Sequence, residues 1–185
     1  MNILVRTFEG RHVVRPDTTW ENDNDNFFPP DYIDSLTFSP VIFARICKPG
    51  RFIGEKYTLR YYDSASFGIL LYPEDLIVDA LGYAEAIAVD HISHLPVPLM
   101  KVEDCQEGRL RISSNGTSIL ELDSPGKAAI EKAIVSGSTK TYLKTGDLIA
   151  VELAPRAPLC SRADGNLHIE AIFKEHKILD FNIIY

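Results

Sequence analysis

Two histidines, His91 and His94, follow Asp90 in the segment DHISH and are the first candidates for chemistry. Imidazole is the commonest metal-ligating side chain, and histidines three residues apart can share an ion when they lie on one face of a helix. The residues around them alternate between polar and apolar, which is typical of an extended segment. We therefore expect surface or packing histidines, and metal ligation remains the alternative.

Two aspartates and a cysteine are further candidates. Asp23 and Asp25 occupy alternate positions in ENDNDN, as calcium-loop ligands do, but the glycine and closing glutamate of an EF-hand are missing, so a solvated turn is favoured. Cys47 ends the apolar run VIFARIC, which predicts an inert core thiol rather than a nucleophile. The chain contains no GxSxG, GxGxxG, Walker or HExxH motif. The residues alone therefore define no active site.

Length and composition restrict the class of protein. The 185 residues are 45% hydrophobic and contain no linker or repeat, so we expect a single domain over 1–185. Lys and Arg number 19 against 26 Asp and Glu, and the formal net charge of -7 argues against nucleic-acid and membrane partners. The three cysteines are widely spaced and no apolar run reaches the length of a membrane span. These features favour reduced thiols and a cytoplasmic location.

Most of the elements that the sequence predicts, and that must position the candidate residues, are strands. Apolar or alternating runs predict strands at 41–47, 66–72, 147–153, 167–173 and 178–185. Asn115-Gly116 lies between two alternating segments and predicts a two-residue hairpin turn. The stretch 18–30 is rich in Asp, Asn and Pro and predicts a loop.

Helical composition covers three segments, 54–63, 73–82 and 126–136. In the second, Pro73 suits the first turn and Gly82 suits a left-handed end. In the third, Ser124 and Pro125 form a cap and first-turn pair, and Gly137 marks the stop. The elements together predict a mixed fold in which strands are the majority.

Five blocks in a fixed order give the sequence a family resemblance. They are RPDTT at 15–19, FFPPDY at 27–32, ARICKPGRFI at 44–53, RYYD at 60–63 and LKTGDLI at 143–149. In this order they resemble the fumarylacetoacetate hydrolase family, particularly its short bacterial members. The resemblance implies an α+β fold that is mainly β, a mixed β-roll or sandwich with a few short helices.

Enzymes of that family hold magnesium, calcium or manganese through a Glu-x-Glu pair and an Asp, and they act on acylpyruvate-like keto acids. By the resemblance, the Glu-x-Glu pair falls on Ser39 and Val41, and the Asp falls on Leu70. Ser39 keeps one neutral oxygen and the other two side chains supply none, so a dication would lose most of its countercharge. We expect these positions to be remnants of a metal site, with no metal cofactor.

Other parts of the family's machinery are replaced. Its Thr-Gly-Thr-Pro segment is matched by VELA at 151–154, and Ile87 stands where its lysine falls. Its catalytic histidine lies on an amino-terminal strand and lid, where this chain has only Met1 to Val14, so we expect a truncated lid and no catalytic residue. The expected remnants of the substrate pocket are Arg15, Asp17, Val151, Glu152 and Leu153.

These replacements favour a non-catalytic relative that serves as a binding or assembly protein. The resemblance implies a homodimer, and a small ligand or an active relative are possible partners. One alternative is an enzyme of acylpyruvate-like keto acids with relocated residues, drawn from Glu152, His168 and Glu170. A second alternative is a keto-acid sensor that keeps a cationic anchor such as Arg45 or Arg60.

Overall fold

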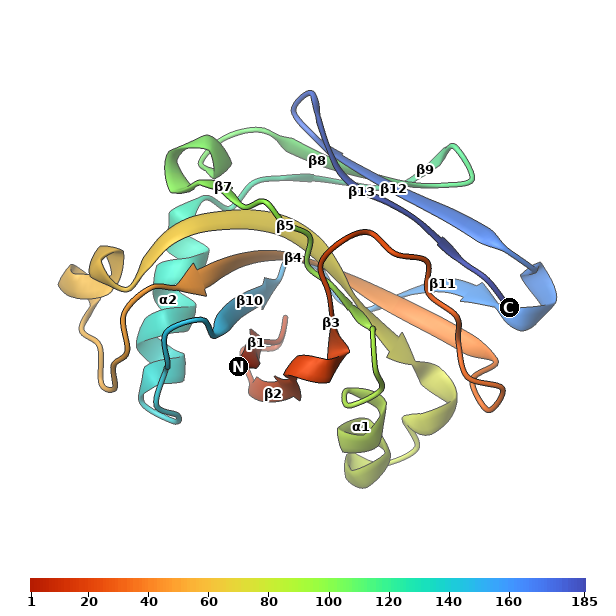
Figure 1. The fold of residues 1–185 in the computed structure, drawn as a ribbon, viewed down its shortest axis with the longest axis horizontal. Coiled ribbons are helices and arrows are strands. Elements are labelled where there is room, and N and C mark those ends of the chain that lie inside the picture. The colour runs from red at the N-terminus through yellow and green to blue at the C-terminus, as the bar shows by residue number, and fades with distance from the viewer.

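Two β-sheets carry most of the chain, which the computed structural model describes from Met1 to Tyr185 (Figure 1). The larger sheet has the strand order β2-β1-β10-β4-β5-β6-β3, with β11 paired to β4 and β7 paired to β5. Its strands are β1 (Asn2–Arg6), β2 (His12–Pro16), β3 (Trp20–Glu21), β4 (Ser35–Ile46), β5 (Tyr62–Pro73), β6 (Ser93–His94), β7 (Met100–Lys101), β10 (Leu148–Glu152) and β11 (Ala157–Ser161). The predicted mainly β architecture is confirmed.

The smaller sheet has the order β13-β12-β8-β9 and covers one face of β4 and β5. Its strands are β8 (Arg109–Ser114), β9 (Thr117–Asp123), β12 (Leu167–Phe173) and β13 (His176–Ile183). The helices are α1 (Ala80–Ala86), α2 (Lys127–Ser138) and five short 3-10 helices, η1 (Asp17–Thr19), η2 (Glu55–Arg60), η3 (Glu74–Leu76), η4 (Val102–Cys105) and η5 (Arg162–Asp164). None of these helices has the length and apolar character that crossing a membrane requires.

The antiparallel pair β4 and β5 is the centre of the molecule. Each strand has 12 residues, and both are buried along most of their length because each face of the pair is covered. Since successive side chains point to opposite faces, Ile42 and Ala44 belong to one apolar cluster while Val41 and Phe43 belong to another. The strand predicted over 41–47 is confirmed, although it begins earlier, at Ser35.

The larger apolar cluster lies between the two sheets and extends under α2. Phe67 of β5 packs against Phe173 of β12 with 4.3 Å between ring centroids. Ile130 and Ile134 share one face of α2 and are buried in the same cluster. This cluster fixes the smaller sheet and α2 against one face of the central pair.

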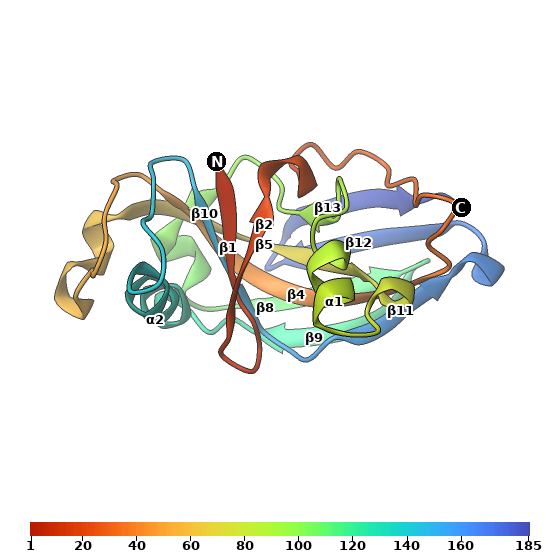
Figure 2. The same cartoon turned by 90° about the horizontal axis from the view of Figure 1, so that it is seen from below.

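The opposite face of the central pair is covered by β1, β2 and α1, which lie in front of it in Figure 2. Its smaller apolar cluster contains Ile3 and Val5 from β1, Leu148 from β10 and Ile87 just after α1. The three predicted metal-site positions, Ser39, Val41 and Leu70, lie on this face. We call it the inner face.

The hairpin predicted at Asn115-Gly116 is confirmed. β8 and β9 pair on either side of it, and both turn residues have positive φ, 47° and 78°, as a type I′ turn requires. The strands predicted at 147–153, 167–173 and 178–185 are also confirmed, as β10, β12 and β13.

Two of the three predicted helices differ from the prediction. The segment 54–63 forms only the 3-10 helix η2. The helix predicted over 73–82 is wrong in its bounds, because Pro73 still belongs to β5 and Gly82 lies inside α1. The Asp79 carboxylate accepts hydrogen bonds from the backbone N–H groups of Leu81 and Gly82, so this N-cap sets the start of α1.

The helix predicted over 126–136 is confirmed as α2, but the signals at its two ends act differently. The hydroxyl of Ser124 donates to the carbonyl of Cys105, so this side chain anchors the approach to α2 instead of capping it. Gly137 lies inside the last turn. A Cβ there would come within 2.6 Å of the Leu4 side chain, so the glycine allows α2 to pack closely against β1.

Candidate functional site

The structure brings Ser39, Val41 and Leu70 together on the inner face. Ser39 of β4 lies directly opposite Leu70 of β5, and Val41 lies two residues further along β4 on the same face. Opposite residues in an antiparallel pair have Cβ atoms about 4.5 to 5.5 Å apart. The three positions therefore lie close together on one face of the central pair.

The three side chains are fully buried. Val41 and Leu70 belong to the apolar cluster of the inner face, beside Phe43, Ile3 and Val5. The hydroxyl of Ser39 donates to the carbonyl of Ala154 at 2.8 Å, so its proton is already used. The three positions are therefore surrounded by packed apolar side chains.

A divalent cation does not fit this donor set. Hard cations take six or more oxygen ligands, usually with two or more carboxylates. The converging positions offer one hydroxyl oxygen, and the chain contains no group of three His, Cys, Asp or Glu side chains that could hold a metal ion. The residues of the inner face therefore give no coordination shell for the family's metal.

A buried arginine occupies one corner of the inner face. Arg15 of β2 is fully buried and lies opposite Ile3 of β1. Its guanidinium donates to the carbonyl of Leu71 through both terminal nitrogens at 3.2 Å, and to the hydroxyl of Ser93 at 3.2 Å. It lies over the ring of Tyr72 with 4.4 Å between its central carbon and the ring centroid. Its Nε has no hydrogen-bond partner.

Tyr72 connects Arg15 to a buried carboxylate. The phenol of Tyr72 donates to one oxygen of Glu152, and the backbone N–H of Phe8 donates to the other at 2.9 Å. Burial raises the pKa of Tyr72 above its ordinary value; the Arg15 guanidinium opposes this rise and the Glu152 carboxylate adds to it. The phenol therefore stays protonated and acts as a hydrogen-bond donor.

A pocket of about 310 Å³ opens beside this corner. Arg156 lies over the rings of both Tyr72 and Tyr83, at 5.2 and 5.8 Å, and pairs with Glu74 at 3.6 Å. The pocket thus presents two guanidinium groups and two carboxylates around one aromatic wall. Its lining residues are Thr7, Glu9, Arg11, Val13, Tyr83, Glu152 and Arg156.

The predicted remnants of the substrate pocket divide between the two faces. Arg15 and Glu152 lie together at the corner just described. Val151 and Leu153 belong instead to the cluster between the sheets, because alternate residues of β10 point to opposite faces. Asp17 is exposed and faces the amino-terminal ammonium group at 3.6 Å.

His91 and His94 do not form a pair. The exposed His91 has its Nδ1 at 3.2 Å from the Glu21 carboxylate, whereas His94 is buried and stacks on Phe181 with 3.8 Å between ring centroids. Neither ring nitrogen of His94 has a hydrogen-bond partner. The expectation of surface or packing histidines agrees with this placement.

We expect His94 to make stability fall in acid. Burial lowers its pKa from 6.5 to about 3, with a smaller contribution from His91. Because the folded-state pKa lies below the unfolded value, the unfolded chain binds the proton more tightly between these two pH values, and stability falls as pH decreases through that window. Between pH 7 and pH 5 the wild type should lose about 2 kcal/mol more stability than His94→Phe, from a slope of about 1.4 kcal/mol per pH unit.

Urea unfolding at pH 7 and pH 5 measures this difference. His176→Phe replaces an exposed histidine and is the matched control. Its loss of stability from pH 7 to pH 5 should equal that of the wild type. An equal pH dependence for His94→Phe and the wild type would contradict this assignment.

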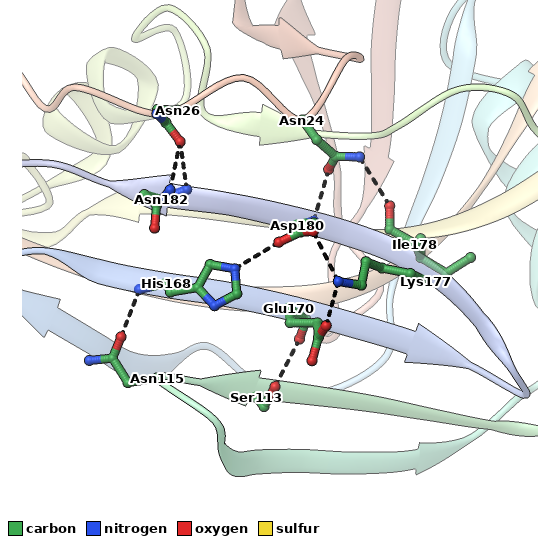
Figure 3. Close-up of polar contacts among 10 residues, drawn as sticks. All are labelled: Asn24, Asn26, Ser113, Asn115, His168, Glu170, Lys177, Ile178, Asp180 and Asn182. Carbon is green, nitrogen blue, oxygen red and sulfur yellow. Dashed lines mark hydrogen bonds and ion pairs between the residues drawn. The ribbon is translucent and has the colours of Figure 1, made fainter.

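His168 and Glu170 lie on the exposed face of the smaller sheet (Figure 3). His168 contacts Asp180 at 2.7 Å, while Lys177 bridges Asp180 and Glu170 at 3.0 and 2.8 Å. His168 and Lys177 lower the pKa of Asp180. The two residues share a face as the alternation predicts, but Glu152 belongs to the other sheet, so the three do not gather in one cleft.

Three further candidates lie elsewhere. Arg45 and Arg60, the proposed anchors of a keto acid, are exposed, and Arg60 rests on the ring of Tyr57 at 4.9 Å. The prediction that Cys47 is a core thiol is wrong, because the apolar strand ends at Ile46 and Cys47 is exposed. Desolvation and the nearby Asp63 raise the pKa of its thiol, so the expected low reactivity is consistent with this environment.

Asp23 and Asp25 lie in an irregular segment, outside the helices and strands. Their backbone N–H groups donate to the carboxylate of Glu21, at 2.9 and 3.4 Å. The segment is therefore organised by local hydrogen bonds around Glu21, as expected for a turn rich in Asp and Asn.

Several solved structures share this architecture. A fumarylacetoacetate hydrolase family protein from Yersinia pestis aligns with a TM-score of 0.84 and 15% identity, over 99% of this chain and 92% of its own. Fumarylpyruvate hydrolase from Pseudomonas aeruginosa, solved with Mn²⁺ and pyruvate, aligns with a TM-score of 0.84 and 11% identity, over 100% of this chain and 89% of its own. The isomerase of 2-hydroxyhepta-2,4-diene-1,7-dioate from Mycobacterium marinum aligns with a TM-score of 0.82 and 14% identity, over 99% of this chain and 74% of its own.

No family model and no curated protein matches the sequence. The chain nevertheless has the fold of the fumarylacetoacetate hydrolase family over its whole length, and the resemblance predicted from the five sequence blocks is confirmed at the level of the fold. Those hydrolases and isomerases are what this chain is similar to in structure.

Sequence reasoning missed the residues that complete the polar corner. Tyr72, Tyr83 and Arg156 carry no motif, and they come from three separate places, β5, α1 and the segment between β10 and β11. One signal in the sequence could have identified Tyr72. It lies two residues after Leu70 in a predicted buried strand, so both side chains point to the same face.

Proposed function

We propose that this protein is a non-catalytic relative of the fumarylacetoacetate hydrolase family that acts as a binding or assembly protein. The observation that carries the proposal is the convergence of Ser39, Val41 and Leu70 inside a packed apolar cluster. Cleaving an acylpyruvate requires an electrophile that stabilises the developing enolate and a base that activates water. Neither group is available at this position.

The nearest candidate base is already engaged. Both oxygens of Glu152 accept hydrogen bonds, from Tyr72 and from the backbone of Phe8, and the side chain is buried. A substrate group that approached this carboxylate would have to displace one of these two donors. The polar corner therefore supports a structural or binding role better than proton abstraction.

A second candidate function is a sensor for a small carboxylate. The pocket of about 310 Å³ presents Arg11 and Arg156 beside the aromatic wall of Tyr83. Arginine recognises carboxylates through paired hydrogen bonds. This candidate replaces the predicted anchors Arg45 and Arg60, which lie on the surface away from this pocket.

Turnover and ligand binding distinguish these functions. We expect no hydrolysis, decarboxylation or isomerisation of acylpyruvates with magnesium or manganese, and turnover that is lost in Glu152→Gln would support the enzyme alternative instead. A rise in melting temperature with pyruvate or oxalate that disappears in Arg156→Gln, but not in the surface control Arg109→Gln, would support the sensor. A homodimer and a cytoplasmic location remain predictions from the resemblance and the composition.

A further inference from the structure

One end of the molecule carries a concentration of positive charge that the net charge of -7 conceals. The segments 48–60 and 140–144 contain six cationic side chains and a single carboxylate, Glu55. We call this surface the basic end. Its cations are all exposed, and none forms an ion pair, whereas Arg109, Arg111, Arg156, Arg162 and Lys177 elsewhere are paired. The six are Lys48, Arg51, Lys56, Arg60, Lys140 and Lys144.

Backbone hydrogen bonds hold the two segments of the basic end together. Gly50 and Leu143 exchange bonds of 3.0 and 2.9 Å, and the N–H of Phe52 donates to the carbonyl of Ser138 at 3.0 Å. Arg51 lies over the ring of Phe52 at 4.9 Å. The cations are thus displayed on a fixed backbone and supported by aromatic rings.

Phe52 is an unusual residue at this end. Its side chain is 69% exposed, and its backbone has φ of 53°, in the left-handed region that bulky residues rarely adopt. The strain is not repaid by burial of the ring within this chain. Strained residues cluster at functional sites such as ligand clamps and switch regions, so the exposed and strained Phe52 marks this end as a candidate contact surface.

The opposite charge gathers around a pocket of about 510 Å³. Asp25 and Asp90 line it together with the rings of Phe28 and Tyr32, and no lysine or arginine does. Glu21 and His91 also line it and contact each other at 3.2 Å. These two rings are 65% and 61% exposed. We call this cavity the acidic pocket.

The two surfaces lie apart along the length of the molecule. In Figures 1 and 2 the segment with η2 forms one end, while the loop that precedes β4 extends toward the other end, where the carboxyl terminus lies. One surface projects and is cationic; the other is hollow and anionic. Both expose aromatic rings, which are enriched in protein interfaces together with arginine.

We propose that the basic end of one copy docks into the acidic pocket of a second copy. The Arg51 guanidinium then meets carboxylates of the pocket, and the ring of Phe52 packs against Phe28 and Tyr32. A second copy is the occupant that the observations favour, since the chain itself carries both complementary halves. The contact is head-to-tail, so repeated docking would join copies in a row, and it is a contact separate from the homodimer that the family resemblance implies.

Charge-reversal variants of the full chain test this docking by sedimentation velocity at low salt. Arg51→Glu with Lys56→Glu should weaken self-association by about tenfold or more, and so should Asp25→Lys with Asp90→Lys. A mixture of the two variants should associate again, because each supplies the half that the other has lost. Lys101→Glu with Lys127→Glu, at exposed positions outside both surfaces, is the matched control and should associate like the wild type.

Phe52→Gly separates docking from folding. Glycine relieves the positive φ, so this variant should unfold at a higher urea concentration than the wild type while its self-association weakens by about tenfold. Unchanged association in Phe52→Gly would overturn the proposal, and so would a wild-type chain that stays monomeric at low salt. Binding to an acidic protein or a nucleic acid that needs the basic end but not the acidic pocket would overturn it as well.

Discussion

Leu70→Asp is expected to lower the free energy of unfolding by about 5 kcal/mol at pH 7, enough to unfold many domains. The substitution introduces the residue type that the family resemblance predicts for this position. It removes a fully buried leucine from the inner face and sets a carboxyl group among Val41, Ile3 and Val5. Loss of the buried side chain costs about 2 to 5 kcal/mol, and the unpartnered polar group adds to it.

The pH dependence of the same variant separates charge from packing. Burial raises the folded-state pKa of a carboxyl group above its unfolded value of about 3.9, so the folded state binds the proton more tightly. Stability is then fully present at low pH and is lost as pH rises through the folded-state pKa. Leu70→Asn has nearly the same shape without the charge, and the gap between the two variants should widen by about 1.4 kcal/mol per pH unit above pH 4.

Urea unfolding from pH 4 to 8, with and without Mn²⁺, measures this prediction. We expect Mn²⁺ to give Leu70→Asp no protection, because Ser39 and Val41 contribute no carboxylate beside the new one. A variant as stable as the wild type would show that the inner face is loosely packed or hydrated. Rescue by Mn²⁺ would show that further ligands approach Leu70 from elsewhere in the chain.

Arg15→Met is expected to destabilise the protein by about 3 to 4 kcal/mol. Methionine fills similar volume, so the main loss is the guanidinium, which is fully buried and bonds the Leu71 carbonyl and the Ser93 hydroxyl. Removing it takes both of these hydrogen bonds from the Leu71 carbonyl and leaves the Ser93 hydroxyl with Thr19 as its partner, at 3.0 Å. It also removes the cation that lies over Tyr72, whose phenol holds the buried carboxylate of Glu152.

Arg15→Lys is the informative companion variant. It keeps the charge but loses the planar fork that reaches Leu71 and Ser93 together, so about half of the stability loss should remain. Urea unfolding at pH 7 compares both with the wild type, and Arg11→Met, at an exposed position, is the matched control. A loss below about 1 kcal/mol for Arg15→Met would show that the arginine is dispensable for the inner face.

The strands and the hairpin were predictable from local patterns. The apolar runs that became β4, β5, β10, β12 and β13 are fully or alternately buried, and Asn115-Gly116 can adopt the positive φ values of its turn without large strain. Helix bounds were less predictable. At 73–82 the signals of Pro73 and Gly82 were outweighed by the pairing of β5 and by the Asp79 cap, neither of which the helical signals reveal.

The inner face shows why the site was only partly predictable. Placing Ser39, Val41 and Leu70 together depended on a family resemblance, because no local pattern links β4 to β5 in this register. The burial of Arg15 could not be read from the sequence, since an isolated arginine is usually exposed and its partners are the Leu71 carbonyl and the distant Ser93. The prediction that Cys47 is buried was wrong because an apolar run in the sequence does not show at which residue the strand ends.

Manganese binding tests the central claim, that the inner face holds no divalent cation, most directly. Free Mn²⁺ gives a six-line electron paramagnetic resonance signal that weakens on binding, and fumarylpyruvate hydrolase from Pseudomonas aeruginosa, solved with Mn²⁺, is a suitable positive control. We predict that adding the wild-type chain in excess leaves the free signal unchanged, with or without pyruvate. Loss of the signal at one ion per chain, abolished by a substitution on the inner face, would contradict the account.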